Sequence, residues 1–363
     1  MKIINYIIWF ANWLVAILLL LCYLARYVDP GHTVFFAFLG LAYPVLLIIN
    51  LCFIIWWLFF KYKRGLLSLL VILLGVALLG NIWRPVAKNL PENERNDAIK
   101  LMSYNVQLFG LYDWQNNKKI KDSIFRFLEE EQPDIICFQE YFFSEQGHFP
   151  TRSELVDILN ARNFHEGIAI EAKMEQKFGM ASYLKYPIVG KGEVQFPESR
   201  NMFIFTDFLW GTDTVRLYNI HLQSIYFDDQ NYQDVDANFL TDIDKDRLSG
   251  YNTIRRKLSY AFRQRARQAV LVAKHIEKSP FPVIVCGDFN DTPLSFAYHQ
   301  VGKNLKDGFK ASGKGLGLSY ERKYLRVRID HVLYSKMFKA YEFKAHKIGY
   351  SDHFPVSCYL NKK

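Results

Sequence analysis

The sequence predicts an α/β domain that follows three membrane-spanning helices, and two observations lead to this prediction. Charge is unevenly distributed: residues 1–84 hold seven Lys, Arg, Asp and Glu side chains, whereas the rest of the chain holds 39 of the 45 basic and 35 of the 36 acidic groups. After Ala98, short apolar runs alternate with segments of helical periodicity, which is typical of α/β domains. Since half of the 363 residues are apolar, intrinsic disorder is excluded, and the charge split excludes a single soluble globule.

Three uncharged apolar runs make up the amino-terminal part. Ile3–Tyr23 and Val34–Phe60 are long enough to cross a hydrocarbon core about 30 Å thick, and Leu66–Ile82 is a shorter third run. We therefore predict a three-span transmembrane anchor over residues 1–84. A cleaved signal peptide is the alternative for the first run. The two apolar runs that follow it, with no A-x-A-like site between them, favour the anchor.

Basic residues beside the spans predict the orientation. Lys61, Lys63 and Arg64 form the densest positive cluster next to any span, so the positive-inside rule places this loop in the cytoplasm. With three spans, the chain after Arg84 then lies outside. We therefore expect a multi-pass protein of the cell membrane whose α/β domain is extracytoplasmic.

The soluble part has a linker, a single domain and one polar insertion. Residues 85–97 are polar, contain two prolines, and are predicted to form the linker; residues 98–363 form the domain, which is large enough to bury a full core. Residues 226–250 are predicted to be a long surface loop. The predicted strands are Ile99–Val106, Asp134–Gln139, Met180–Leu184, Met202–Leu209, Thr214–Leu222, Phe281–Cys286, Arg328–Leu333 and Pro355–Leu360. The predicted helices are Lys119–Glu130, Ser153–Asn160 and Asn252–Glu277.

Polar residues gather in six segments, each at an end of a predicted strand or just before one. They are Ser103–Asn105, Gln139–Glu140, Asn219–Leu222, Gly287–Asp291, Arg328–His331 and Ser351–His353. Taken singly, an Asp or Asn after a strand is most often a turn residue. Six such endings in one domain, rich in Asp, Glu, Asn and His, point instead to a shared site.

These residue types suit phosphoester chemistry that depends on a hard cation. Carboxylate oxygens hold Mg²⁺, amides and imidazoles neutralise phosphate oxygens, and a carboxylate can orient the attacking water. The sequence has no HExxH or close Cys/His cluster for zinc, no G-x-S-x-G for a serine hydrolase, and no Walker A motif. The residues therefore favour a metal-dependent hydrolase.

The ordered motifs together resemble the endonuclease/exonuclease/phosphatase superfamily, which includes DNase I, abasic-site endonucleases, neutral sphingomyelinases and inositol polyphosphate 5-phosphatases. The resemblance runs from about Lys100 to Leu360. It implies a DNase I-like, four-layered α/β sandwich with the active site at one end. The apolar runs ahead of the domain resemble membrane-anchored bacterial members.

The resemblance also implies a metal site. By position, Glu140 would be the principal ligand of Mg²⁺, with Mn²⁺ as the alternative ion, Asn105 would lie beside it, and Asp352 near it. His331 and Asp291, which neighbour the motifs, are predicted to be structural.

Five further residues receive catalytic roles from the resemblance. Asp288 would orient or deprotonate the attacking water, and Asn290 would bind phosphate and position Asp288. His221 would contact the scissile phosphate. His353, oriented by Asp330, would act as the acid or base or stabilise the transition state.

Three functions follow as hypotheses. The first is a membrane-anchored, Mg²⁺-dependent phosphoesterase acting on a phosphodiester or phosphomonoester of a lipid headgroup or another extracytoplasmic compound. The second is a membrane-bound endonuclease or exonuclease acting on DNA or RNA. The third is a non-catalytic sensor or scaffold, which is disfavoured because every expected catalytic position is filled. No obligate protein partner is inferred.

The helix predicted over Asn252–Glu277 bears on the substrate. It carries Arg255, Arg256, Lys257, Arg263, Arg265, Arg267 and Lys274. Such a helix is either an ordinary solvated face or a basic surface that attracts anionic lipid headgroups or nucleic acid. Since the soluble part has a net charge of only +4, a dedicated nucleic-acid binder is disfavoured.

Overall fold

The computed structural model describes residues 2–111, 113, 117–144, 151–172, 176–225, 245–322 and 325–363. They form two compact units. The helical unit comprises the described parts of Met1–Ala77, Gln223–Val270 and Leu294–His299, and the sheet unit those of Leu78–Leu222, Leu271–Pro293 and Gln300–Lys363. Most of the predicted 226–250 loop, residues 226–244, lies outside the described residues.

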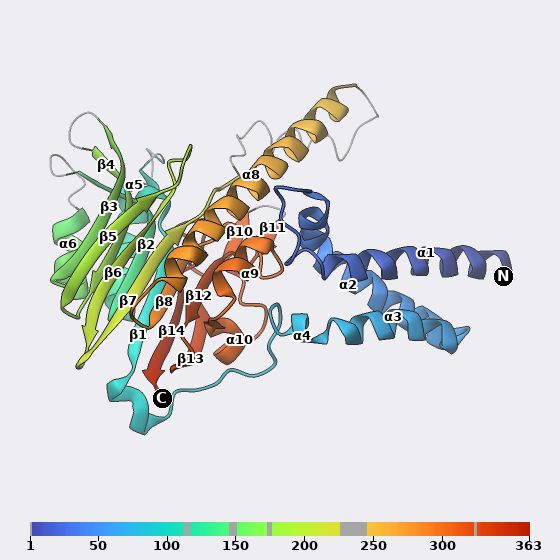
Figure 1. Cartoon of the computed structure of the whole chain (residues 1–363), viewed down its shortest axis with the longest axis horizontal. Coiled ribbons are helices and arrows are strands. Elements are labelled where there is room, and N and C mark those ends of the chain that lie inside the picture. Colours follow the sequence, from blue (N-terminus) through green and yellow to red (C-terminus); the bar gives the residue numbers. More distant parts are fainter. Residues whose placement is uncertain are drawn as a thin grey trace. The chain divides into compact units, whose positions relative to one another are not determined.

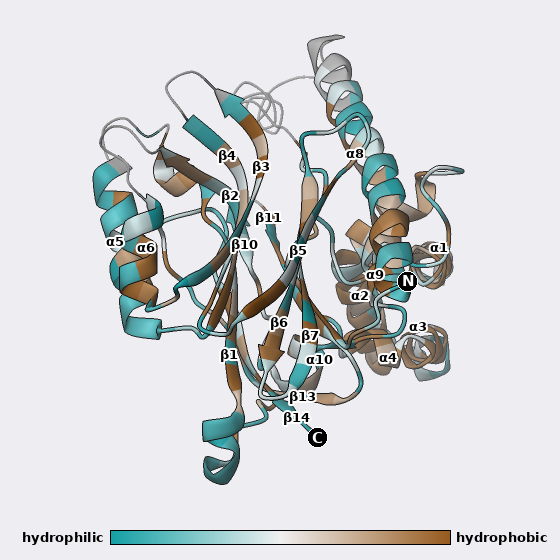
Figure 2. Ribbon diagram, turned by 60° about the vertical axis from the view of Figure 1, so that its left-hand side comes forward, coloured by the Kyte–Doolittle hydropathy of each residue, from teal (hydrophilic) through white to brown (hydrophobic). Residues whose placement is uncertain are grey.

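The amino-terminal helices are apolar over most of their length (Figure 2). Two of them, α1 (Lys2–Cys22) and α2 (Phe35–Phe59), are long and apolar enough to cross a membrane. The prediction of a third span is wrong. The third run forms α3 (Tyr62–Leu74), which ends at Gly75 before the short α4 (Val76–Leu79). Glycine is a poor helix former, and 13 helical residues reach only about 20 Å.

Polar side chains join α1, α2 and α3. Asn12 Nδ2 donates to Ser68 Oγ at 2.6 Å, Ser68 Oγ donates to Asn50 Oδ1 at 2.8 Å, and Trp57 Nε1 donates to Asn12 Oδ1 at 2.9 Å. All four side chains are fully buried. Such hydrogen bonds hold apolar helices together where burial of apolar surface cannot do so.

The sheet unit contains two six-stranded sheets (Figure 1). The first consists, in spatial order, of β13 (Phe338–Ala345), β14 (Val356–Lys362), β1 (Ile99–Asn105), β2 (Ile135–Ser144), β4 (Gln176–Leu184) and β3 (Asn163–Ala172). The second consists of β5 (Ile188–Gln195), β6 (Met202–Trp210), β7 (Asp213–His221), β8 (Val283–Asp288), β12 (Asp330–Tyr334) and β9 (Lys306–Asp307). A separate hairpin pairs β10 (Tyr320–Arg322) with β11 (Leu325–Val327).

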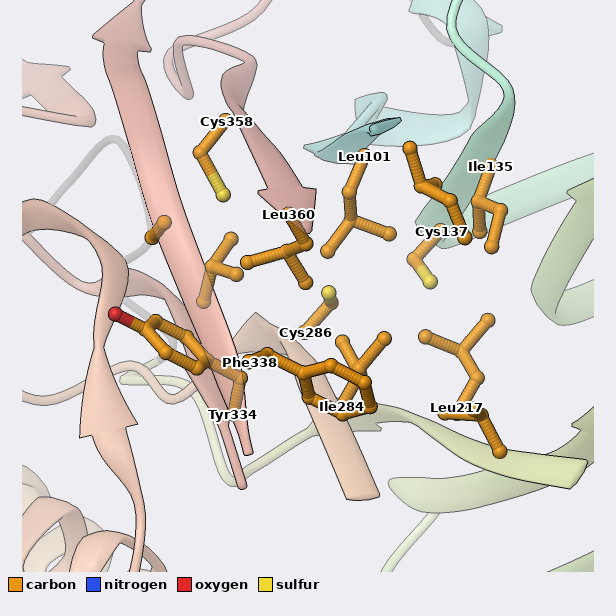
Figure 3. Close-up of a cluster of buried hydrophobic side chains, with 14 of the residues drawn as sticks. Leu101, Ile135, Cys137, Leu217, Ile284, Cys286, Tyr334, Phe338, Cys358 and Leu360 are labelled. Carbon is orange, nitrogen blue, oxygen red and sulfur yellow. The ribbon is translucent and has the colours of Figure 1, made fainter. Parts of the chain in front are cut away.

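The two sheets pack face to face over one apolar core (Figure 3). Leu101 and Cys137 of the first sheet and Ile284 and Cys286 of the second meet there, all fully buried. Because side chains alternate along a strand, the neighbours of Leu101 and Cys137 point to the outer face of the first sheet. The mixed α/β sheets are consistent with the DNase I-like fold that the sequence resemblance implies.

Helices cover the outer faces. On the first sheet, Ile124 and Leu128 of α5 (Asn117–Glu131) and Leu155 of α6 (Thr151–Leu159) pack on residues such as Met102 and Phe138. On the second sheet, His275 near the end of α8 contacts the rings of Phe203, Phe205 and Tyr218. The helix α8 runs over Lys245–Glu277 and so begins seven residues before the predicted Asn252.

All eight predicted strands are present, with their ends shifted by a few residues. The prediction missed β3, β5, β9, β10, β11 and β13, as well as the short helices α9 (Phe296–Gly302) and α10 (Gly308–Ser312). Along β5, half-buried residues alternate with exposed ones, and three of its eight residues are Gly or Lys, so it lacks an apolar run.

The predicted linker, residues 85–97, lies within the sheet unit and, together with Arg84 before it, contacts the rest of that unit at several points. Arg84 forms a β-bridge with Gly315, and the Lys88 amide donates to the Ser312 carbonyl. A short 3₁₀ helix over Glu92–Asp97 follows, where Glu94 accepts a hydrogen bond from Tyr341 at 2.9 Å. These contacts fix the segment on the sheet unit at several points.

A buried cluster around His331 supports β12. Arg328 donates to His331 Nδ1 at 2.9 Å and to Asp307 Oδ2 at 3.0 Å, so His331 Nε2 carries the proton that it donates to the Asp291 carbonyl. All three side chains are less than a tenth exposed. Burial, together with the charge of Arg328, lowers the pKa of His331 from 6.5 to about 3.

We expect this cluster to make the protein sensitive to acid. Below pH 6.5 the unfolded chain binds a proton at His331, whereas the folded chain does so only near pH 3, so the free energy of unfolding falls as pH falls through this window. The slope is about 1.4 kcal/mol per pH unit. Urea unfolding of the detergent-solubilised protein, followed by near-ultraviolet circular dichroism at several pH values, measures it. His331→Asn removes the titration and should flatten the slope; equal slopes in both proteins would contradict this account.

Candidate active site

The strand ends that carry the predicted site residues meet in the sheet unit. The strands β1 and β2 are parallel, with Asn105 beside Gln139, and β7 and β8 are parallel, with His221 beside Asp288. The antiparallel strand β12 places Asp330 on the other side of Asp288. Asp288 thus has a predicted site residue on each neighbouring strand.

Gly287 makes the close approach of β8 to β7 feasible. Its φ is +147°, and a Cβ at this position would lie 1.9 Å from the Ile220 carbonyl oxygen. Only glycine tolerates both conditions. The residue therefore sets the position of Asp288, which follows it.

Two site residues sit in backbone conformations that are uncommon for side chains other than glycine. Glu140 has a φ of +48° and lies in a β-bulge, where the β2–β4 register shifts between Phe138 and Tyr141. Asn290 has a φ of +52°. A bulge redirects a side chain from its place in the regular pleat, and such conformations gather at functional sites.

Asp288 is the buried centre of the cluster, with 1% of its surface exposed. It accepts hydrogen bonds from Asn105 Nδ2 at 3.0 Å, from the Asn290 amide at 2.7 Å and from Asn290 Nδ2 at 3.1 Å. Burial raises the pKa of Asp288 to about 6, and the nearby positive charge of His353 opposes that rise. The carboxylate is thus poised near neutral pH.

His353 bridges two carboxylates. Its Nδ1 lies 3.0 Å from Asp330 Oδ2, and its Nε2 lies 3.6 Å from Asp288 Oδ2. Burial by itself would lower the pKa of His353, but Asp330 and Asp288 outweigh it and raise that pKa to about 10. His353 is therefore an imidazolium at neutral pH. Asp288, Asp330 and His353 also place potential ligand atoms within 4.8 Å of one another, but a protonated His353 cannot bind a metal.

His221 Nε2 is buried and has no hydrogen-bond partner among the described residues. It lies 3.7 Å from Asp288 Oδ2 and 3.9 Å from Glu140 Oε1. A buried polar atom without a partner is costly in a finished structure and is expected where a ligand binds. With the oxygens of Glu140, this nitrogen fits a site for a hard cation and a phosphate oxygen.

The remaining predicted ligands are placed as follows. Asn105 donates its Nδ2 to Glu140 Oε1 at 3.2 Å, while its Oδ1 accepts from the Gln107 amide, so its nitrogen and not its oxygen faces the carboxylates. Asp352 is half-buried, and its charge contributes to the raised pKa of His353. All eight predicted site residues thus belong to one neighbourhood.

Comparison with protein families gives two matches. The model of the endonuclease/exonuclease/phosphatase family matches residues 102–353, and a domain of unknown function matches residues 5–82. The chain belongs to the endonuclease/exonuclease/phosphatase family. Members of this superfamily are typically metal-dependent phosphoester hydrolases. No curated protein matches the chain.

Solved structures of the same superfamily share the fold. Truncated TDP2 of Caenorhabditis elegans is 15% identical, with a TM-score of 0.51, over 74% of this chain and 100% of that chain. The family protein of Bacteroides vulgatus is 17% identical, with a TM-score of 0.52, over 73% and 99%. TDP2 of D. rerio, in complex with a single-stranded DNA product, is 17% identical, with a TM-score of 0.51, over 73% and 99%.

Sequence reasoning missed two residues that support the His353–Asp330 pair in this family member. Ser319 is fully buried, and its Oγ accepts the amides of Ile329 and Asp330 at 3.0 and 2.9 Å. The next residue, Tyr320, pairs with His353 in a β-bridge and packs its ring edge-on against the imidazole at 4.9 Å. The only sequence cue was a Ser-Tyr pair beside a short strand without an apolar run.

We expect Gly287→Ala to destabilise the sheet unit by about 3 kcal/mol or more, because the new methyl group meets the Ile220 carbonyl and the positive φ becomes strained. Thermal unfolding measures the loss. Gly315→Ala is the matched control, because its φ is also positive but nothing lies within 4 Å of its Cβ. Similar losses in both variants would show that backbone strain, and not the close approach, decides the outcome.

We expect Tyr320→Ala to free the His353 ring, because it removes the edge-on contact, and to lower kcat about tenfold with little change in KM. Tyr320→Phe keeps the ring and should restore kcat. Steady-state kinetics of phosphodiester hydrolysis across pH 5–10 measures both, and the Ala variant should also shift the alkaline limb of the profile. Equal losses in the Phe and Ala variants would instead assign the role to the hydroxyl group.

Proposed function

We propose that this protein is a membrane-anchored, Mg²⁺-dependent phosphoesterase that hydrolyses a phosphodiester or phosphomonoester. One observation carries the proposal: the buried Asp288 carboxylate, with its pKa raised to about 6, lies between the imidazolium of His353 and the unpartnered nitrogen of His221. An acid, a base and a free phosphate-binding group in one cluster suit hydrolysis of a phosphate ester.

In the proposed reaction, Asp288 orients a water molecule and accepts its proton as the water oxygen bonds to phosphorus. The bond from phosphorus to the leaving oxygen breaks at the same time, and His353 donates a proton to that oxygen. Asp330 orients the ring of His353 and stabilises its positive charge, because Asp330 Oδ2 lies 3.0 Å from His353 Nδ1. Asn290 holds Asp288 in place through two hydrogen bonds, and His221 Nε2 receives a phosphate oxygen.

Glu140, with Asn105 and Asp352 nearby, would hold the metal ion. Glu140 is partly exposed, with a third of its side-chain surface open, so a carboxylate oxygen is free to bind a cation. For Asn105 to contribute its oxygen, its amide must turn about its last bond. A bound Mg²⁺ would supply positive charge next to the phosphoryl oxygens.

The helices α1 and α2 support a membrane location, and we propose an extracytoplasmic site. Within the helical unit, residues 223–270 and 294–299 contact the end of the bundle where α1 ends and α2 begins. The basic cluster Lys61–Arg64 lies at the opposite end, after α2. α3 then runs back beside α1, with Arg64 donating to the Asn5 carbonyl and Tyr23 donating to the Val71 carbonyl, so the chain returns to the first end without a third continuous span. If the basic cluster is cytoplasmic, these segments of the enzyme domain lie outside.

For the substrate we favour a lipid headgroup or another exported phosphoester, because an anchored enzyme meets lipid substrates at a high effective concentration. A nuclease is the second candidate. It is favoured by the likeness of the fold to TDP2, one structure of which holds a single-stranded DNA product. A non-catalytic scaffold is disfavoured, since all eight predicted residues lie in one neighbourhood.

Asp288→Asn should lower kcat at least 100-fold, because it removes the base and keeps the side-chain shape. The full chain in nanodiscs is assayed with Mg²⁺, with and without EDTA, on phospholipids, polyprenyl phosphate, bis-p-nitrophenyl phosphate, DNA and RNA. Asp213→Asn, an exposed carboxylate paired with Lys362, is the matched control. Hydrolysis confined to lipids or small esters supports the first candidate, and cleavage of DNA or RNA that Asp288→Asn loses supports the second. Activity that Asp288→Asn retains would overturn the site assignment.

A further inference from the structure

The middle of α8 packs on the apolar helices inside the helical unit. The rings of Phe262 in α8 and Phe38 in α2 meet edge-on, with their centroids 5.3 Å apart. Beside them, Arg26 after α1 lies 3.1 Å from His299 Nδ1 of α9, and Tyr27 packs edge-on against the same imidazole at 5.0 Å. These contacts hold α8 and α9 at the end of the bundle where α1 stops and α2 starts.

That end of the bundle corresponds to a membrane surface, if α1 and α2 span the membrane as proposed above. Phe38 lies three residues into α2, about 4.5 Å along its axis from the first residue. Phe262 is therefore placed near the boundary between hydrocarbon and headgroups. The exposed side chains of α8 next to it are then at the depth of lipid phosphates.

The exposed side of α8 in this unit is basic. Arg256, Tyr260, Arg263 and Arg267 follow the spacing i, i+4, i+7 and i+11, so they lie on one side of the helix, and all four are exposed. We call this set the arginine stripe. Residues 250–270 contain six basic and no acidic residues, in contrast to most solvated helices, which carry both signs. No arginine of the stripe forms an ion pair within the described part of the chain.

We propose that the arginine stripe of α8 binds the headgroups of anionic phospholipids. Guanidinium groups bind phosphate with two parallel hydrogen bonds, and Tyr260 has the amphipathic ring that is typical of the headgroup zone. Juxtamembrane basic residues raise the affinity for anionic lipid about fivefold each. The stripe belongs to the same unit as the exposed apolar side chains of α1 and α2, which match a bilayer, whereas a nucleic acid would have no counterpart for those side chains. This favours lipid over DNA or RNA as the partner.

The test compares the full chain in nanodiscs of neutral phosphatidylcholine and in nanodiscs that also contain phosphatidylglycerol. Phenylglyoxal modification of each arginine is followed by mass spectrometry. We expect Arg263 and Arg267 to react about fivefold more slowly with phosphatidylglycerol present, and high salt to remove the protection. Arg200, exposed between β5 and β6 of the sheet unit, is the internal control and should react at the same rate in both.

A triple variant, Arg256→Gln, Arg263→Gln and Arg267→Gln, gives a second readout. It should retain fewer phosphatidylglycerol molecules after mild detergent extraction than the native chain, while the control pair Arg162→Gln and Arg200→Gln should not. Equal modification rates in both nanodiscs, or equal lipid retention, would overturn the proposal. Protection by single-stranded DNA but not by phosphatidylglycerol would assign the stripe to nucleic acid instead. Extraction by alkaline carbonate tests the membrane anchor separately. A protein that is not anchored is thus distinguished from an anchored protein whose arginine stripe does not bind lipid.

Discussion

The Asp288 carboxylate, buried among the strand ends, constrains the arrangement of the sheet unit. A charged Asp288 with 1% exposure is tolerated only if its neighbours replace the water that it has lost. Asn105 and Asn290 do so by hydrogen bonds, and His353 by its charge. Each of these three comes from a different segment of the chain. The fold must therefore hold these segments in register, since moving any of them leaves the carboxylate uncompensated.

That register is supported by a second set of polar residues buried between the sheets. Gln139 of β2 donates to Asn219 Oδ1 of β7 at 2.7 Å, and Asn219 Nδ2 donates to the carbonyls of Phe138 and Ala181 at 3.1 and 3.0 Å. Both side chains are fully buried. The amide side chains thus join β2 of one sheet to β7 of the other. Gln139 directly precedes Glu140, and Asn219 lies two residues before His221. A buried polar network specifies one arrangement, because every shifted alternative leaves polar atoms without partners.

Much of this arrangement was predictable, because the residues that end apolar strands are local features of the sequence. The strand ends at Asn105, His221 and Asp288 could be read directly from apolar runs that finish in polar residues, whereas β2 continues past Glu140 to Ser144. That they meet follows from parallel pairing of their strands, which the family resemblance implied and the runs alone did not establish. Their roles likewise came from the resemblance.

Other features depended on tertiary contacts and could not be predicted. The bulge that turns Glu140 is set by its pairing with β4, and the support for Asp330 comes from Ser319, the residue directly before β10, a strand without an apolar run. The third apolar run looked like a span because hydropathy takes no account of where a helix ends. Its break at Gly75 lies where Tyr23 comes within 2.3 Å of the position that a Cβ would occupy, so close packing also favours glycine there.

The catalytic cluster does not identify the substrate. Acid, base and metal ligands act on the phosphate group, which lipid headgroups and nucleic acids share, so these residues cannot discriminate between them. Discrimination must come from groups that contact the rest of the substrate. The features that this chain adds to the α/β sandwich are the apolar helices and α8, which pack together in the helical unit and leave the basic side of α8 exposed. An apolar surface beside a helix segment, residues 250–270, that carries basic but no acidic side chains is complementary to a bilayer with anionic headgroups, and on this ground the lipid assignment is preferred.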